Sequence, residues 1–206
     1  MMKFSDVAEI VTGSTPSTKD PENYGEFIPF VKPPDLNGSV ITETESNLSE
    51  KGSKLARIIP RNSVLVGCIG SLGKIAIAGR ELATNQQINA LVFNENLVHP
   101  RYGFHYCRTI GPILKHMAPA TTIPLVNKSR FSTIKMPVPP LNEQKRIAAI
   151  LDKAEEIKTI SEQTFQTRNL FLNAIFLDFF GEILTGHSTC EYATLNDCSK
   201  FIDYRG

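Results

Sequence analysis

The chain has 206 residues, a formal net charge of +1 and 41% hydrophobic residues, which is an ordinary globular composition. This length predicts one domain with an extension, or two small domains, and the near-zero net charge excludes a generally basic or acidic protein. The sequence opens with Met1-Met2-Lys3 and polar residues, and no stretch reaches the roughly 20 apolar residues of a membrane span. We therefore expect a cytoplasmic protein without a membrane partner.

Charge is distributed unevenly along the chain. Residues 1–55 carry 5 Lys and Arg against 9 Asp and Glu, whereas residues 56–140 carry 10 Lys and Arg against only Glu81 and Glu95. Residues 141–206 return to an acidic excess, with 10 Asp and Glu against 7 Lys and Arg. A basic middle between acidic flanks indicates a local site for a polyanion, and a chance scatter of surface cations is the simpler alternative.

The cysteines and histidines do not form a pattern of metal ligands. The 4 cysteines contain no C-x-x-C pair and the 4 histidines are not spaced as ligands, so a zinc site is not expected and the thiols should be reduced. No Ser or Cys lies in a nucleophile-elbow context, and acidic residues are sparse in the basic middle, which argues against a nuclease metal site. We expect no catalytic residue, no metal and no cofactor.

The first 140 residues predict an α+β domain with a β-rich core. An amphipathic opening at residues 4–11 and a polar loop at 12–25 precede a strand at 27–31. Apolar runs at 64–66 and 74–78 flank a glycine turn and predict a hairpin, and residues 90–93 predict another buried strand. Residues 102–117 have helical spacing that would break at Gly111-Pro112, 121–128 are expected to be extended, and 129–135 predict one helical turn.

A long helix is predicted after the domain. Pro137, Pro139 and Pro140 prevent a helix from running backward, because the residue before a proline favours extended geometry. Asn142 is the expected N-cap, and no proline or glycine follows until Gly181. A helix over the 39 residues 142–180 would measure about 58 Å. This length favours a spacer or a dimerisation arm.

The predicted helix carries a seam with alternating spacings of three and four residues. Its first part is apolar, with Ile147, Ile150, Ala154 and Ile157 in the seam and Leu151 beside it. The same register continues through polar residues and returns to apolar ones, in the order Ser161, Thr164, Arg168, Phe171 and Ile175. We predict that this seam pairs with a partner of defined length and that its polar middle fixes the register.

Polar clusters within the domain are candidates for binding DNA. Residues 67–74 resemble a phosphate-binding loop, but Cys68 replaces its first glycine and a strand follows Lys74, so a hairpin turn that presents Lys74 to a phosphate is expected. Asn and Gln side chains can bind an adenine edge, although runs of amides occur more often in turns. The candidate DNA contacts are Lys74, Arg80, Asn85, Gln86, Gln87, Thr121, Thr122, Asn127, Lys128 and Arg130.

The end of the chain resembles its beginning. Phe4-Ser5-Asp6-Val7, with Ile10-Val11 before Gly13, matches Leu195-Asn196-Asp197-Cys198, with Phe201-Ile202 before Gly206. This match indicates one complete unit, its spacer helix and the start of a second unit.

The stretch PLNEQKRIAAILD at residues 140–152 resembles the sequence that opens the spacer helix in DNA-specificity subunits of type I restriction–modification enzymes. Residues 4–16, 70–74, 83–91 and 134–140 are similar to further stretches of that family, in the same order. Residues 203–206 resemble the opening of a second target-recognition domain. The resemblance implies two such domains, each followed by a conserved helix, with the helices packed antiparallel and each domain reading half of a bipartite DNA site. It also implies that separate modification and restriction subunits carry out methylation and cleavage.

We therefore expect a non-catalytic subunit that recognises double-stranded DNA and docks modification and restriction subunits. Its parts would be a target-recognition domain at 1–140, a spacer and dimerisation helix at 141–181, and a linker with the start of a second domain at 182–206. Two copies would pair antiparallel through the helix as a homodimer on a palindromic split site. The alternatives are a stand-alone DNA methyltransferase or nuclease, and a structural coiled-coil adaptor. For the methyltransferase, the string nearest to its Asp/Asn/Ser-Pro-Pro-aromatic motif is Val138-Pro139-Pro140-Leu141, which lacks the polar and the aromatic residue.

Overall fold

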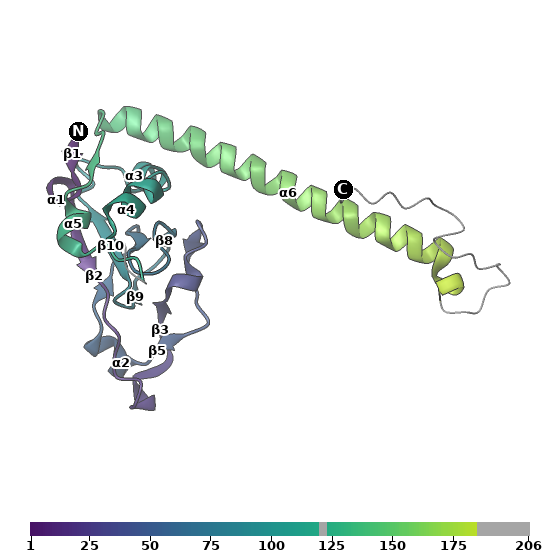
Figure 1. Cartoon of the computed structure of the whole chain (residues 1–206), viewed down its shortest axis with the longest axis horizontal. Coiled ribbons are helices and arrows are strands. Elements are labelled where there is room, and N and C mark those ends of the chain that lie inside the picture. The colour runs from purple at the N-terminus through teal and green to yellow at the C-terminus, as the bar shows by residue number, and fades with distance from the viewer. Residues whose placement is uncertain (120–122, 185–206) are drawn as a thin grey trace, which may run out of the picture. The chain divides into compact units, whose positions relative to one another are not determined.

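The computed structural model describes residues 1–119 and 123–184, and it confirms the predicted α+β class (Figure 1). The chain divides into a globular unit, Met1–Lys153, and a second unit that begins at Ala154. The long helix α6 (Leu141–Leu184) starts in the first unit and continues into the second. No helix among the described residues combines the length and apolar character that crossing a membrane requires.

A five-stranded mixed sheet forms the centre of the globular unit. Its strands are β2 (Ala8–Thr12), β4 (Val40–Ile41), β7 (Val64–Gly67), β8 (Ile75–Ala78) and β10 (Ile88–Phe93). They follow the order β2-β10-β7-β8-β4, in which only the β4–β8 pair is parallel. The predicted hairpin is confirmed as β7–β8, with Leu65 opposite Ala76, and the predicted strand at 90–93 lies within β10.

Both faces of this sheet are buried, against different layers. Successive side chains of a strand point to opposite faces. Val64 and Val66 of β7 therefore contribute to a core shared with helices, while Leu65 between them contributes to a core shared with a second sheet. β8 repeats the alternation, with Ile75 on the helical side and Ala76 on the other.

The second sheet has four strands in the order β5-β3-β9-β6. These are β3 (Tyr24–Val31), β5 (Asn47–Leu48), β6 (Ile58–Ile59) and β9 (Leu82–Thr84). β3 begins three residues before the predicted strand at 27–31. The helix α2 (Glu50–Leu55) and the 3-10 turns η1 (Pro21–Asn23) and η2 (Pro33–Asp35) belong to the same part of the chain, and α2 lies beside β3 and β5 at one end of the unit (Figure 1).

Short helices cover the other side of the five-stranded sheet. They are α1 (Phe4–Val7), α3 (Pro100–Cys107), α4 (Gly111–Met117) and α5 (Lys128–Ser132), beside the paired strands β1 (Met2–Lys3) and β11 (Lys135–Met136). The predicted break in the helical spacing at 102–117 is confirmed, because α3 and α4 are separate, but the break falls at residues 108–110 and Gly111-Pro112 starts α4 instead of interrupting a helix. Proline fits the first turn of a helix, where no backbone partner is lost. Lys128 is helical and not extended, since Asn127 caps α5.

Helix α6 differs from its prediction at both ends. It begins at Leu141, where the carbonyl of Pro140 accepts the amide of Gln144 at 3.0 Å, so Asn142 is already helical and is not the N-cap. It also continues through Gly181 to Leu184, because one glycine costs a helix only about 1 kcal/mol. Its 44 residues correspond to about 66 Å.

Candidate functional site

The sequence stretch at residues 140–152 forms a joint between the start of α6 and the rest of the globular unit. Gln144 is fully buried, and its amide nitrogen donates to the carbonyl oxygens of Leu97 at 2.8 Å and Pro139 at 2.7 Å. Its Oε1 accepts the backbone N–H of His99 at 2.9 Å. The amide is therefore satisfied by three backbone groups, as a buried polar side chain requires. Pro139 and Pro140 serve this helix start and not a catalytic motif.

Asp152 provides a second contact of the joint, eight residues after Gln144 on the same helix face. Its Oδ1 accepts from Arg101 Nε at 3.1 Å and lies 2.7 Å from His105 Nε2, both on α3. Between the two contacts, Ala148 is buried in the helical core and Ile147 packs against that core. Partial burial tends to raise the pKa of Asp152, but the hydrogen bonds and positive charges of Arg101 and His105 hold that pKa below its ordinary value.

After the joint, α6 exposes many large apolar side chains. Ile157 is 59% exposed and Phe171 is 62% exposed. Of the predicted seam, Ile150, Leu151, Ala154, Ile157, Phe171 and Ile175 are exposed, whereas Ile147 contacts the globular core. The prediction missed the exposed residues Ile160, Phe165, Leu170, Leu172, Phe176, Leu177, Phe179 and Phe180. For the six that follow Asn169, the signal is the density of Leu and Phe there, which a strict three–four register overlooks.

The polar middle of the seam is partly satisfied by its own helix. The hydroxyl of Thr164 donates to the carbonyl of Ile160 at 2.8 Å. The guanidinium of Arg168 lies 4.7 Å from the ring centroid of Phe165, close enough for a cation–π contact. Ser161 is exposed. These contacts let polar groups lie in an otherwise apolar seam.

Acidic residues are missing from the sequence stretch that contains α3, α4 and α5. No Asp or Glu occurs between Glu95 and Glu143, a stretch that carries six cations, namely Arg101, Arg108, Lys115, Lys128, Arg130 and Lys135. Arg130 Nη1 donates to the carbonyl of Met117 at 2.8 Å, which brings α5 to the C-terminal end of α4. Lys128 is exposed, and Asn127 uses its Oδ1 to cap α5 by accepting the amide of Arg130 at 2.9 Å.

The β7–β8 turn is a hairpin turn and not a phosphate-binding loop. Gly70 and Gly73 have φ of 69° and 78°, in the left-handed region that favours glycine. The backbone N–H groups of residues 70–74 all donate to carbonyl oxygens of the protein, so they do not form an open nest for an anion. Lys74 is exposed, and its side chain is the part of this turn that is free to bind an anion.

The three consecutive amides bind one another and the loop beside them. Asn85 Nδ2 donates to Gln87 Oε1 at 2.9 Å, and the hydroxyl of Thr15 donates to Gln86 Oε1. Gly13 is tightly packed here, because a Cβ at this position would lie 2.2 Å from the carbonyl oxygen of Asn85. Asn85 and Gln87 are half-buried, whereas Gln86 is exposed. Gln86 is therefore the amide with the most freedom to contact a ligand.

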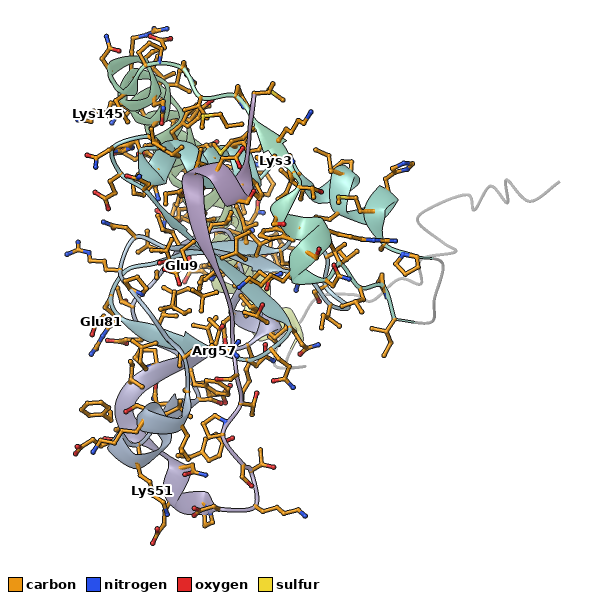
Figure 2. All side chains as sticks on the ribbon, turned by 90° about the vertical axis from the view of Figure 1, so that its left-hand side faces the viewer. Lys3, Glu9, Lys51, Arg57, Glu81 and Lys145 are labelled. Carbon is orange, nitrogen blue, oxygen red and sulfur yellow. The ribbon has the colours of Figure 1, made fainter. Side chains whose placement is uncertain are left out.

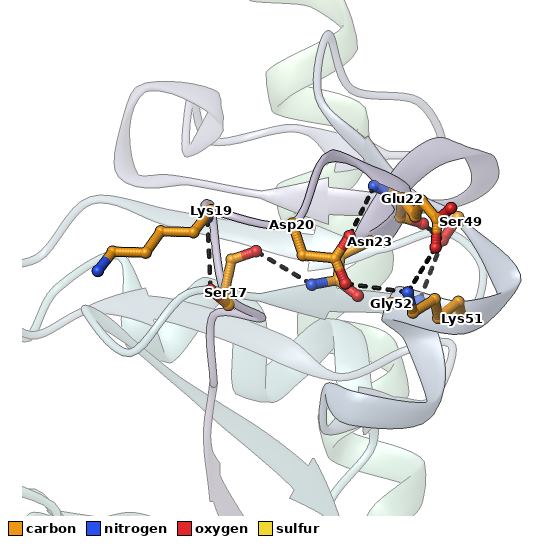
Figure 3. Close-up of polar contacts among 8 residues, drawn as sticks. All are labelled: Ser17, Lys19, Asp20, Glu22, Asn23, Ser49, Lys51 and Gly52. Carbon is orange, nitrogen blue, oxygen red and sulfur yellow. Dashed lines mark hydrogen bonds and ion pairs between the residues drawn. The ribbon is translucent and has the colours of Figure 1, made fainter.

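The opposite end of the globular unit is acidic. We call residues 20–55 the acidic end, because they carry Asp20, Glu22, Glu26, Asp35, Glu43, Glu45 and Glu50 against three lysines. Lys51 is paired there with Asp20 at 2.9 Å and Glu22 at 2.6 Å (Figure 3). Figure 2 shows Lys51 at one extremity of this unit and Lys145 at the other. The predicted contact Arg80 lines a hollow of about 220 Å³ together with Glu26 and Glu43 of this end.

The described cysteines are buried and unsuited to nucleophilic chemistry. Burial raises the pKa of the Cys68 thiol to about 12 and that of Cys107 still higher, so both thiols stay protonated. Among residues 1–119 and 123–184, no three His, Cys, Asp or Glu side chains gather as ligands for a metal ion. The predicted contacts Thr121 and Thr122, the terminal repeat and the remaining two cysteines lie outside the described residues.

Comparison with known proteins defines the class of this chain. The family model described as "Type I restriction modification DNA specificity domain" matches residues 1–167. The match covers the whole globular unit and the first half of α6. The chain belongs to this family of DNA specificity domains, which is a family of recognition and not of catalytic domains.

Individual relatives agree with this assignment. The chain is 32% identical to the type I restriction enzyme HindI specificity subunit of Haemophilus influenzae, over 84% of this chain and 39% of the relative. It is 30% identical to the MjaIX specificity subunit of Methanocaldococcus jannaschii, over 86% of this chain and 42% of the relative. The chain thus spans about two fifths of the length of these relatives.

Solved structures share the fold. The HsdS subunit of Thermoanaerobacter tengcongensis aligns with a TM-score of 0.64 at 19% identity, over 79% of this chain and 38% of that one. A second solved structure describes the complex assembly and conformational transition of the type I R-M system. One of its chains aligns with a TM-score of 0.72 at 19% identity, over 91% of this chain and 46% of that one.

Proposed function

We propose that this chain recognises double-stranded DNA within a type I restriction–modification system in the cytoplasm, and that it directs separate methyltransferase and restriction subunits to a bipartite site. The observation that carries this proposal is the DNA specificity family match over the entire globular unit. The acid-free stretch between Glu95 and Glu143 supports it, because exposed cations such as Lys115 and Lys128 attract a polyanion.

The geometry sorts the candidate DNA contacts by role. Lys74, Lys128 and Arg130 are proposed to contact phosphates, since their charges face no acidic group of their own segments. Gln86 is proposed to reach a base edge. Asn85, Gln87 and Asn127 hold their loops and act by positioning. Arg80 could contact DNA only at the border of the acidic end. Thr121 and Thr122 remain candidate DNA contacts because of their residue type.

A second part of the proposal concerns the helix. We infer that α6 pairs antiparallel with the α6 of a second copy and fixes the distance between two recognition domains. The exposed apolar residues after Lys153 support this, because soluble proteins rarely leave a contiguous patch of this kind uncovered. In this arrangement residues 1–140 read DNA, residues 141–181 space the domains and dock the other subunits, and residues 182–206 begin a second recognition domain.

The test is DNA binding by the purified chain as a function of salt, followed by fluorescence anisotropy of a labelled duplex. Binding through phosphates must weaken as salt rises. The slope of log affinity against log salt concentration should be about −0.9 for each phosphate neutralised. A coiled-coil adaptor would show no such binding. Methyl transfer to DNA by this chain alone, without another subunit, would instead favour a stand-alone enzyme. Methylome sequencing of the source cells would identify the target sequence.

A further inference from the structure

A hollow of about 530 Å³ lies between the β7–β8 turn and the end of α4. Lys74 from the turn and Lys115 from α4 both line it, 41 residues apart in the sequence. Apolar surface from Leu72, Ala118 and Pro124 forms other parts of the wall. The family match does not assign a role to this hollow, and Lys115 was not among the residues predicted from the sequence.

The backbone on both sides of the hollow is fixed by close contacts. A Cβ on Gly73 would lie 2.8 Å from the Cα of Gly111, so the turn is packed directly against the start of α4. The N–H of Gly70 donates to the carbonyl of Pro124 at 2.9 Å, and the N–H of Val126 donates to the carbonyl of Cys68 at 2.9 Å. The two lysines therefore start from well-defined positions, and only their flexible stems need to adjust to a ligand.

The charges around the hollow are positive and unopposed. Lys74 and Lys115 are exposed, and neither ammonium pairs with a side chain in the part of the chain that the structure describes. Arg130 is not among the residues that line the hollow, but its Nη1 donates to the carbonyl of Met117, which precedes the wall residue Ala118 in the chain. Nearby apolar walls lower the local dielectric constant and strengthen the attraction of these cations for an anion.

A comparison within the same unit shows that this arrangement is not general. Arg80 lines its hollow beside Glu26 and Glu43. Lys51 is paired with two carboxylates, and Lys54 is paired with Glu50 at 2.9 Å. Lys51 and Lys54 at the acidic end thus have local counter-charges, whereas the hollow beside α4 presents cations that must find theirs in solution or on a ligand.

We propose that this hollow binds one phosphodiester group of the DNA backbone, gripped by Lys74 and Lys115 together, with the adjoining deoxyribose against Leu72 and Pro124. The inference rests on the proposed DNA-binding function and deepens it. Lysine ammonium groups suit phosphate oxygens as mobile point charges, whereas base edges require a more rigid donor pattern. The contact fixes where the domain sits on the duplex and reads no sequence, so it is the same for every target.

The experiment compares Lys74→Gln, Lys115→Gln and the double variant with the unaltered chain, using a DNA duplex of mixed sequence because phosphate contacts do not depend on sequence. Lys19→Gln is the matched control, since Lys19 is exposed and its side chain points away from the polar network of the acidic end (Figure 3). The double variant should lose about 0.9 from the slope of log affinity against log salt, and each single variant less than that, because the lysines share one phosphate. Lys115→Arg keeps the positive charge, so this variant should show the same slope of log affinity against log salt as the unaltered chain.

The outcomes separate this inference from the function on which it rests. Absence of salt-dependent DNA binding by the unaltered chain would overturn the proposed function itself. If the unaltered chain binds DNA normally and the double variant behaves like Lys19→Gln, the hollow does not bind a phosphate. The proposed DNA-binding function would then remain intact. A loss of slope in the double variant of about twice 0.9 would also overturn it, because the lysines would then neutralise two separate phosphates. Circular dichroism and an unchanged thermal midpoint check that each variant is folded.

Discussion

Two stretches of one helix behave differently in this molecule. Residues 141–153 of α6 pack on the globular unit, where Gln144 is fully buried and Ala148 is 2% exposed. Residues 154–181 are richer in large apolar side chains, and those side chains are exposed, as Phe171 and Phe179 illustrate. The stretch that is buried is thus not the more hydrophobic one. Burial within the chain follows from a matching partner surface, here α3 and the loop before it.

The comparison also separates two kinds of contact energy. The joint uses an amide and a carboxylate that need specific partners, so it defines one orientation of the first turns on the domain. The later stretch offers mainly apolar area, which drives association but selects a partner weakly. Its few polar seam residues, such as Arg168, are therefore the natural source of register. Three variants, one of them with two substitutions, test this contrast at different points of the helix.

The largest effect is expected from charges placed in the exposed seam. Replacing Ile157 and Phe171 with Asp removes two large apolar side chains from the proposed pairing surface and would bury two charges in it. Each large apolar side chain contributes about 1.5–3 kcal/mol when it is fully buried, so the dissociation constant of the pair should rise at least a hundredfold. Light scattering across a concentration series measures this change.

The matched control places the same two charges on another face of the helix. Gln166 and Asn173 are both exposed and lie roughly opposite the seam residues on the helix, so Asp at these positions should leave the pairing unchanged. If the unaltered chain is already monomeric at micromolar concentration, α6 does not pair copies of this chain. Equal weakening by the control pair would mean that net charge, and not the seam, governs association.

The next effect concerns the joint. Gln144→Leu leaves the N–H of His99 and the carbonyls of Leu97 and Pro139 without their partner in a buried site. Each unsatisfied buried group costs about 1–3 kcal/mol, so the free energy of unfolding should fall by roughly 3 kcal/mol or more. Urea unfolding followed by circular dichroism measures the loss.

Gln163→Leu serves as its control, because Gln163 is an exposed glutamine of the same helix. That variant should change the free energy of unfolding by no more than about 0.5 kcal/mol. A Gln144→Leu variant as stable as the control would mean that water or a local rearrangement satisfies the three backbone groups, and the joint would then depend on Ala148 and Ile147 alone.

The elements that the sequence predicts well are those with a local cause. The β7–β8 hairpin follows from two apolar runs around a glycine turn, and α6 follows from the absence of proline over a long stretch. The differences from the prediction also have local causes. Gly111-Pro112 signals the start of a helix as readily as its interruption, and Asn127 caps α5, so Lys128 is helical and not extended.

The roles that the sequence does not predict depend on residues far apart along the chain. Nothing near Gln144 indicates that its partners are backbone groups of Leu97 and His99, which lie more than 40 residues away. Lys115 likewise acquires a potential role only when the β7–β8 turn packs on α4. One signal for Lys115 was present, because no acidic residue occurs between Glu95 and Glu143.

The smallest expected effect is the pH dependence of the Asp152 contact. The pKa of Asp152 is lowered in the folded protein, so the folded state binds fewer protons than the unfolded state near the ordinary pKa of about 3.9. The Asp152 contact therefore contributes fully to the free energy of unfolding above the ordinary pKa. This contribution is lost as pH falls through the lower pKa of the folded state. Because the Asp152 side chain is 37% exposed, screening limits the contribution to about 1 kcal/mol.

Asp152→Asn should therefore lower the free energy of unfolding by about 1 kcal/mol at neutral pH, and the difference from the unaltered chain should shrink toward zero as pH falls below 4. Asp178→Asn, at an exposed position later in α6, should produce no such pH-dependent difference. A difference that stays constant down to pH 3 would show that Asp152 acts through shape and not through charge. In that case Gln144 and the buried Ala148 would hold the joint together. The two stretches of α6 would then differ only in that the first makes buried hydrogen bonds and the second exposes apolar area.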